Sequence, residues 1–420
     1  MSEIAIVGSG IAGLGLAYYL RHAIDRITIY EKENYLGGHA NTIETNDSGK
    51  RIPIDTGFMV FNHVTYPLLV ELFAELAVPI KKTDMSFSVQ HKLSGLEYAG
   101  ASFDRLFGDR RNIINPRFWR LLGEIDRFNK EGHAGVAEPA NIALSLAEYA
   151  KRKGHSEDFI NLYLVPMCSA LWSAPPGKMM NFPTITLLRF FKNHGLLGSN
   201  TQHQWWTVEG GSREYVKRLV ATLTSVPRIA SKVLQVRRGT KKVFVSTNDG
   251  VTREFDKVVM ACHADEALRL VAEPTEDESR LLSAFFYQEN DTILHTDSNV
   301  MPIAKRCWAS WNYRIDENNS STHYWMNSLQ QVSETRDYFV TLNGAHLVAP
   351  SQILKRLTYQ HPLFDLAALN AQSNLHVLND RSPRDQVFYC GSYFGYGFHE
   401  DALKSAHQLA EVLRGKVLCQ

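Results

Sequence analysis

The chain has 420 residues, which suggests two or three domains. Its 45 lysines and arginines balance 44 aspartates and glutamates, a net charge of +1 that argues against a nucleic-acid-binding protein. The five cysteines are scattered and form no CxxC pair, so we expect no metal site and a reducing, cytoplasmic environment. No run of 18 or more apolar residues predicts a membrane-spanning helix.

The first forty residues have the order strand, glycine turn, helix, strand and acid. Residues 4–7 predict a buried strand, a G-x-G-x-x-G begins at Gly8, and residues 26–30 predict a second strand that ends at Glu31. This order is the dinucleotide-binding fingerprint, in which a helix N-terminus faces the diphosphate and the acid accepts ribose hydroxyls. We therefore expect NAD or FAD to be bound by Gly8, Gly10, Ile11, Ala12, Gly13, Glu31 and Lys32.

Each glycine of the fingerprint has its own expected role. Gly8 permits the tight turn, Gly10 lets the backbone approach the diphosphate, and Gly13 lets the helix pack closely on the strand.

A glycine pair, Gly37 and Gly38, follows shortly after Glu31. The segment resembles the R-x-G-G-R-x-x-[ST] motif of the amine-oxidase and phytoene-desaturase superfamily of flavoproteins, where it wraps the FAD pyrophosphate and ribityl chain. Tyr35 and His39 stand where that superfamily usually has arginines, whereas Thr42 matches. The resemblance implies FAD, held in part by Gly37, Gly38, His39 and Thr42.

The C-terminal part repeats the pattern of a strand, a glycine-rich loop and a helix. An apolar strand ends at Gly391, and a helix starts near Glu400 with acids in its first turn. This resembles the C-terminal FAD segment of the same superfamily, in which the loop approaches the ribityl chain and the helix points at the flavin pyrimidine. The resemblance implies further FAD-binding residues, namely Gly391, Ser392, Phe398, His399, Glu400 and Ala402.

Two middle segments complete the resemblance. Residues 207–215 open a helix after a glycine pair, and residues 255–262 match the strand that closes the FAD domain of the superfamily. Between them, residues 228–234 resemble the strand whose valine backbone commonly bonds adenine, which implies a contact at Val233. No second G-x-G-x-x-G occurs, which disfavours reductases that bind NADPH in a second Rossmann domain.

The predicted fold is of the α/β class, a Rossmann-type FAD-binding domain with an interleaved α+β substrate domain. The FAD-binding domain is expected to comprise residues 1–60, 204–282 and 381–420. The substrate domain is expected to comprise residues 61–203, mainly helical, and residues 283–380, which mix strands with aromatic residues.

A narrower resemblance concerns the substrate. Segments such as Asp55–Asn62 and Gly397–Asp401 look like a bacterial group of predicted NAD/FAD-binding oxidoreductases that includes a proposed desaturase of methyl-branched fatty acyl chains in furan fatty acid synthesis. The resemblance implies an apolar or acyl-lipid substrate. Residues 164–191 fit either an apolar tunnel or plain lobe core, and residues 186–197 fit a peripheral membrane contact. We interpret the arginines between residues 105 and 127 as a solvated helix face, and the oligomeric state is left open.

The expected reaction is removal of a hydride from a C–H bond onto FAD. Formation of an alkene also needs a base, for which the candidates are His399, His295, Asp297 and Glu400. Amine oxidation is the first alternative, although residues 285–297 lack the lysine that amine oxidases usually place there. A redox-neutral mutase and a lipid- or protein-binding module on the same fold are further alternatives. No cysteine lies in a flavin-attachment context, so we expect noncovalent FAD.

Overall fold

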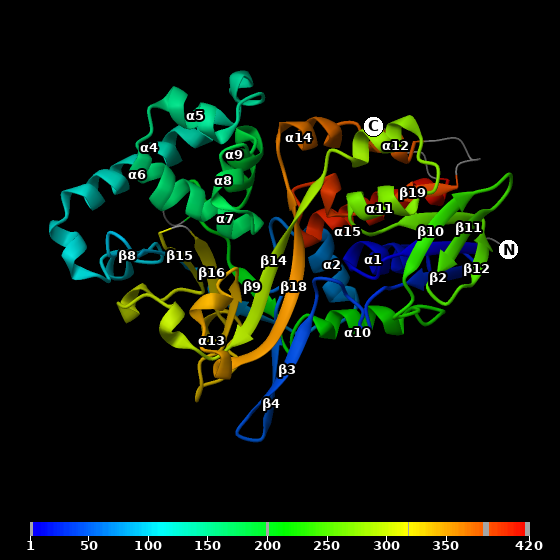
Figure 1. The fold of residues 1–420 in the computed structure, drawn as a ribbon, viewed down its shortest axis with the longest axis horizontal. Helices are drawn as coiled ribbons and strands as arrows, with labels where there is room; N and C mark the ends of the chain where they lie inside the picture. The colour runs from blue at the N-terminus through cyan, green and yellow to red at the C-terminus, as the bar shows by residue number, and fades with distance from the viewer. Residues whose placement is uncertain (1–2, 199–200, 318, 381–385, 416–420) are drawn as a thin grey trace.

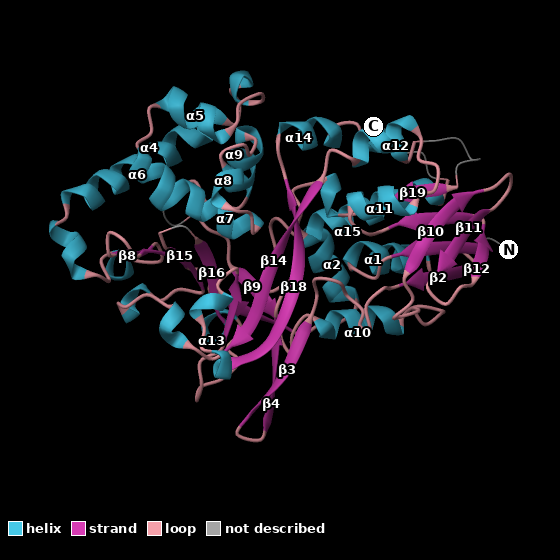
Figure 2. Ribbon diagram, in the orientation of Figure 1, coloured by secondary structure: helices cyan, strands magenta, loops and turns pink. Residues whose placement is uncertain are grey.

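The computed structural model describes residues 3–198, 201–317, 319–380 and 386–415. It has a sheet-and-helix unit that carries both ends of the described chain, and a helical lobe at the opposite end (Figure 1). Two long antiparallel strands, β14 (Phe286–His295) and β18 (Ile353–Leu363), run between these parts (Figure 2).

A four-stranded parallel sheet forms the centre of the first unit. Its order is β19-β13-β1-β2, with bounds Val387–Tyr389, Lys257–Met260, Glu3–Val7 and Arg26–Tyr30. Strands from three distant stretches of the chain therefore pair side by side, as the interleaved arrangement predicts. The exact domain boundaries stay predictions, and residues 381–385 and 416–420 of the third stretch lie outside the described residues.

Helices and a small antiparallel sheet cover the two faces of this sheet. One face packs against α1 (Ile11–Leu20), α2 (Pro67–Glu75), α10 (Arg213–Ala221) and α15 (His399–Leu413). The other face packs against α11 (Ala264–Leu270), α12 (Glu276–Leu282), β10 (Val233–Arg238), β11 (Val243–Thr247) and β12 (Thr252–Phe255). Helix α2 shares the core of α1 and α15, so residues just beyond the predicted boundary at 60 pack with the first unit.

The second unit is a mixed seven-stranded sheet of order β18-β14-β17-β16-β15-β7-β8. Its remaining strands are β7 (Phe87–His91), β8 (Leu96–Ala99), β15 (Trp311–Ile315), β16 (Ser320–Trp325) and β17 (Phe339–Leu342). Shorter sheets link the two units: β3 (Thr42–Asp47) with β4 (Lys50–Asp55), and β5 (Phe61–Asn62) and β6 (Ile80–Thr83) with β9 (Trp205–Val208).

The lobe beside this sheet is helical, as expected for most of residues 61–203. Its helices are α3 (Phe103–Leu106), α4 (Pro116–Gly135), α5 (Leu146–Lys153), α6 (Glu157–Phe159), α7 (Val165–Trp172), α8 (Pro176–Met179) and α9 (Thr184–Asn193). Of two further short helices, α13 (Met326–Leu329) follows β16 of the second unit, whereas α14 (Leu366–Gln372) packs against α12 of the first unit. None of the helices within the described ranges is long and apolar enough to cross a membrane.

The packing inside the lobe bears on the predicted membrane contact of residues 186–197. The apolar side chains of α9, together with Leu197, are buried in the lobe core. This burial argues against a membrane contact at residues 186–197, because most apolar side chains of the segment are not available to lipid.

Candidate cofactor and active site

Four strand ends converge at the carboxyl edge of the parallel sheet. β1 leads into Gly8, β2 into Glu31, β13 through Cys262 into His263, and β19 towards Gly391. Ligands of open parallel sheets bind beyond the carboxyl ends of the strands. This edge therefore brings together three of the residues that the sequence motifs predicted for the cofactor, namely Gly8, Glu31 and Gly391.

The turn after β1 consists of glycines with different structural requirements. Gly8 has a φ of 109°, and an added Cβ would lie 2.6 Å from the carbonyl oxygen of Ala261. An added Cβ at Gly13 would lie 2.0 Å from the carbonyl oxygen of Gly8. Nothing lies within 4 Å of an added Cβ at Gly10. The fold therefore requires Gly8 and Gly13, whereas the space at Gly10 is open to a ligand.

The N-terminus of α1 faces this open space. Gly10 is its N-cap and offers no capping side chain, and the first turn contains no acid. The amides of residues 11–13 have no partner within the helix and lie at its positive end. Gly37 pairs with Gly10, and an added Cβ at Gly38 would lie 3.3 Å from the Gly10 Cα. Such a cradle of backbone amides fits the diphosphate of a dinucleotide.

Glu31 is held rigidly beside the cradle. Its Oε2 accepts hydrogen bonds from the amide and the hydroxyl of Ser9 at 3.0 and 2.6 Å, and its Oε1 accepts one from the amide of Glu33 at 2.9 Å. The remaining lone pairs of this buried carboxylate fit the hydroxyls of a ribose. The side chain of Lys32 instead forms an ion pair with Glu266.

Val233 lies near the end of β2. It is the first residue of β10 and is buried. The amide of Ser231, two residues earlier, donates to the carbonyl oxygen of Glu31 at 2.8 Å. This contact places the start of β10 beside the ribose-binding acid, which is compatible with the expected adenine contact.

His39 belongs to a cluster of three histidines at the same edge. Its ring stacks on Tyr359 with centroids 5.1 Å apart, and lies 5.2 Å from His361 and 6.3 Å from His263. Burial and the neighbouring imidazoles hold the pKa of His39 well below its usual range, and burial lowers the pKa of His361 to about 4. Both rings are therefore neutral at pH 7.

Two ring nitrogens of this cluster are available to a ligand. The Nε2 of His39 and the Nδ1 of His263 are buried and have no hydrogen-bond partner within the described part of the chain. Buried polar atoms are normally satisfied, so these nitrogens next to the glycine cradle fit contacts with a cofactor.

Thr42 is engaged by the protein itself. Its hydroxyl donates to Asp55 at 2.5 Å and accepts from the amide of Arg213 at 3.0 Å. Asp55 also accepts bonds from the Ser212 amide and hydroxyl and from the side chain of Gln330, at 2.7 to 2.9 Å. Burial raises the pKa of Asp55 against these donors. The network connects β4 to the start of α10. Asp55 was not among the residues predicted from the sequence, although an acid at the end of an apolar strand could have indicated it.

Some predicted residues of the C-terminal segment lie at the candidate site, and others pack in the core. Gly391 and Ser392 follow β19 at the carboxyl edge of the sheet. Phe398 is the N-cap of α15, and its ring stacks on Phe190 of α9 with centroids 5.0 Å apart. Ala402 is buried inside the core that α15 shares with α1.

Glu400 acts as a cap for another helix. Its carboxylate accepts hydrogen bonds from the amides of Leu68 and Leu69 at 2.9 and 3.0 Å, at the start of α2. This engagement argues against Glu400 as a base. The prediction that the N-terminus of α15 points at the flavin concerns the backbone of Glu400 and not its side chain.

His399 is the first residue of α15 and lies close to the histidine cluster. Its ring stacks on Phe58 with centroids 3.7 Å apart, and its Nε2 lies 3.0 Å from the hydroxyl of Tyr215. The amide of Phe58 donates to the carbonyl oxygen of His39 at 2.7 Å, which joins the two sites. Burial lowers the pKa of His399 to about 3, so its ring is neutral at pH 7.

The structure does not bring His295 and Asp297 to this site. Tyr287, near the start of β14, stacks on His263, and His295 lies eight residues further along the strand, which is about 27 Å. His295 bonds Thr341 at 2.7 Å and accepts from the amide of Asp297, which caps the short helix after it. Both residues stabilise the far end of the second sheet.

Comparisons with known proteins identify the family. A family model described as "Flavin containing amine oxidoreductase" matches residues 11–302. A comparison with curated proteins gave no match.

Solved structures show the same fold at low sequence identity. Cyclohexylamine oxidase from Brevibacterium oxydans IH-35A is 14% identical with a TM-score of 0.71, over 99% of both chains. A CLA-producing fatty acid isomerase from P. acnes is 16% identical with a TM-score of 0.67, over 97% of both chains. A putative protoporphyrinogen oxidase from Exiguobacterium sp. 255-15 is 15% identical with a TM-score of 0.67, over 99% of both chains.

These findings agree with the geometry at the carboxyl edge of the parallel sheet. The family model covers more than half of the chain, and the glycine cradle and Glu31 fit the diphosphate and ribose of FAD. The chain therefore belongs to the family of flavin containing amine oxidoreductases and is an FAD-dependent oxidoreductase.

Proposed function

We propose that this enzyme oxidises a C–H bond of an apolar substrate, with a methyl-branched fatty acyl chain as the substrate class. The observation that carries the proposal is an aromatic wall that continues from the lobe to the C-terminal FAD segment. Phe398 stacks on Phe190 and lies 6.1 Å from Trp172, whose ring lies 4.5 Å from Phe182. The indole of Trp172 donates to the carbonyl oxygen of Tyr396 at 3.1 Å, which fixes the wall to the segment.

Phe398, the partly buried end of the wall, would contact the substrate, and the buried rings behind it would exclude water. Aromatic faces bind alkyl chains through apolar burial and dispersion. The wall also adjoins His399, the residue after Phe398. An alkyl carbon beside the wall would therefore lie close to the expected flavin position. When bound, FAD supplies the acceptor for the hydride.

We assign the accompanying proton to His399. In the tautomer whose Nε2–H donates to the Tyr215 hydroxyl, Nδ1 has the free lone pair that can accept the proton. The imidazole is neutral at pH 7 because burial lowers its pKa to about 3. The rate should therefore stay constant as the pH falls through the ordinary histidine range and should fall only near the lowered pKa.

Amine oxidation is the second candidate. It is supported by the family model and by the fold shared with cyclohexylamine oxidase and with a putrescine oxidase. β14, the strand that begins beside the histidine cluster, contains no lysine. This departure from the usual amine-oxidase pattern favours the acyl substrate.

A substrate comparison tests the proposal. The FAD-loaded enzyme is mixed with an artificial electron acceptor and either methyl-branched acyl chains or a panel of alkyl amines. Reduction of the acceptor by acyl chains, together with a new double bond in the extracted lipid, would support the proposal. Reduction by amines alone would overturn it and establish the second candidate.

A further inference from the structure

We propose that the outer end of the helical lobe binds the surface of an anionic lipid membrane. The surface consists of the β7–β8 turn, residues 102–120 and residues 303–306, and is called the lobe tip below. The inference rests on its exposed side chains and charges, and it is independent of the substrate proposed above.

The lobe tip exposes apolar side chains that soluble proteins normally cover. Ile114 is 86% exposed, Ile303 81% and Phe103 74%, and Trp119 and Ile113 are each about half exposed. Single exposed apolar residues are common, but a group of them on one surface marks an interaction site.

Contacts show that these residues share one surface. The ring of Phe107 lies 4.8 Å from that of Phe103 and 5.1 Å from that of Trp119. The indole of Trp119 donates to the carbonyl oxygen of Ile113 at 2.9 Å. Phe107 itself is buried, so it joins the exposed side chains from below.

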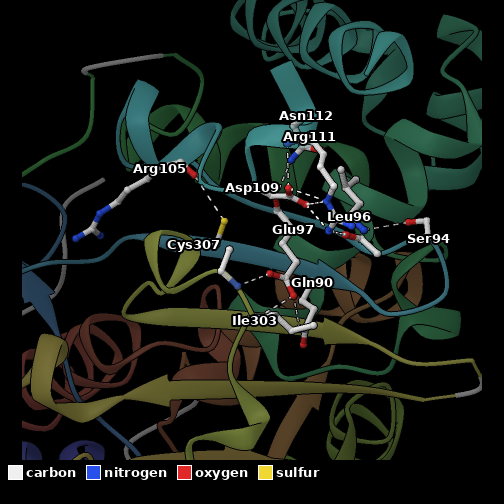
Figure 3. Close-up of polar contacts among 12 residues, drawn as sticks. Gln90, Ser94, Leu96, Glu97, Arg105, Asp109, Arg111, Asn112, Ile303 and Cys307 are labelled. Carbon is white, nitrogen blue, oxygen red and sulfur yellow. Dashed lines mark hydrogen bonds and ion pairs between the residues drawn. The ribbon is translucent and has the colours of Figure 1, made fainter. Parts of the chain in front are cut away.

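The segment that carries Ile303 is anchored to β8 through Glu97. The buried carboxylate of Glu97 accepts hydrogen bonds from the amides of Ile303 and Ala304, both at 2.9 Å. The carbonyl oxygen of Glu97 accepts a bond from the side chain of Asn112 at 2.8 Å. Figure 3 shows Ile303 on one side of Glu97, with Asn112 and Arg111 on the other. The exposed side chains therefore project from a fixed frame.

The charge of the lobe tip matches an anionic surface. Residues 92–120 and 303–306 contain eight lysines and arginines and three acids, although the whole chain has a net charge of +1. Glu97 is buried, and Asp104 and Asp109 form ion pairs with Arg110 and Arg111. Of the other cations, Arg105, Arg117 and Arg306 form ion pairs with Asp84, Asp158 and Asp104. Lys92, Arg120 and Lys305 form no ion pair within the described residues and supply the positive excess of this surface.

The arrangement favours a bilayer over a protein partner. Cations alternate with apolar residues along the segment from Arg110 to Arg120, and protein interfaces are depleted of charge at their apolar centres. A lipid interface suits both kinds of side chain, because tryptophan and isoleucine enter the acyl boundary while arginines reach phosphates.

Vesicle flotation of the FAD-loaded enzyme tests the proposal. Vesicles of phosphatidylcholine are compared with vesicles that also contain phosphatidylserine. We expect flotation with the anionic vesicles only, weakened by added salt. Ile114→Ser and Arg120→Gln should each lower the fraction bound, with Arg120→Gln weakening partition about fivefold.

Val226→Ser is the matched control, because Val226 is 87% exposed but lies outside the lobe tip. Equal loss for Val226→Ser and Ile114→Ser would overturn the proposal, and so would flotation that ignores lipid charge. The alternative is that the lobe tip binds a second copy of the chain, and sedimentation tests it by measuring the oligomeric state. A dimer that dissociates in Ile114→Ser, without vesicle binding by the original enzyme, would show a protein interface and contradict the proposal.

Discussion

Gly10→Ala should abolish tight FAD binding while leaving the fold intact. Gly10 has a φ of −65° and nothing within 4 Å of an added Cβ, so alanine fits the protein without strain. The methyl group would point into the space at the N-terminus of α1. The diphosphate would have to move away from the amides of residues 11–13.

The expected magnitude follows from the bonds that would be lost. A hydrogen bond to a charged group contributes about 1.5–3 kcal/mol, and displacing the diphosphate weakens at least one such bond. The dissociation constant for FAD should therefore rise about 10- to 100-fold or more. Exchange of glycine for alanine at an N-cap should cost the apoprotein about 1 kcal/mol at most.

Titration of apoprotein with FAD, followed by flavin fluorescence, measures the first quantity, and thermal unfolding of the apoprotein measures the second. Gly123→Ala is the matched control, because Gly123 in α4 also has nothing within 4 Å of an added Cβ. It should leave FAD binding unchanged. Gly13→Ala should instead destabilise the apoprotein, since its Cβ would lie 2.0 Å from the Gly8 carbonyl oxygen. An unchanged FAD affinity in Gly10→Ala would refute the assignment of the diphosphate to α1.

Three further predictions concern the acids and the histidines. Glu31→Gln should weaken FAD binding about tenfold through poorer ribose contacts, measured by the same titration; an unchanged affinity would contradict the ribose assignment. Glu400→Ala should lower apoprotein stability by about 1–2 kcal/mol through loss of the α2 cap, measured by urea unfolding, and a loss of FAD without loss of stability would show a direct cofactor role. The pKa values of His399, His194 and His361 are lowered to about 3, 4 and 4. The unfolded chain gains these protons near pH 6.5 and the folded chain does not, so stability present above pH 6.5 should fall by about 1.4 kcal/mol per histidine for each pH unit below it. Equal urea midpoints at neutral and mildly acidic pH would contradict the neutral, buried state of these rings.

Local patterns were sufficient to predict the parallel sheet and the glycine turn. The strands around residues 4–7 and 26–30, the turn at Gly8 and the acid at Glu31 follow one another within forty residues, so their spacing constrains their geometry. Apolar strands before Cys262 and Gly391 could be assigned to the same sheet because the motifs occur in a fixed order.

Long-range contacts were beyond the sequence. His361 on β18 and His263 at the start of α11 are both more than 200 residues from His39, and no local pattern predicts that they meet it. The carboxylate of Glu400 was placed near the flavin by its position in a motif, although it caps α2. His295 was a candidate base by residue type, but it lies at the far end of a long strand, whose length separates it from the site.

Anaerobic flavin reduction tests the central claim most directly. The purified enzyme, with its yellow flavin bound, is mixed with a methyl-branched acyl chain in the absence of oxygen, and the flavin absorbance is followed. The account predicts loss of the yellow colour with acyl chains, and formation of one double bond for each flavin reduced. Flavin that stays oxidised with acyl chains but is bleached by alkyl amines would contradict it.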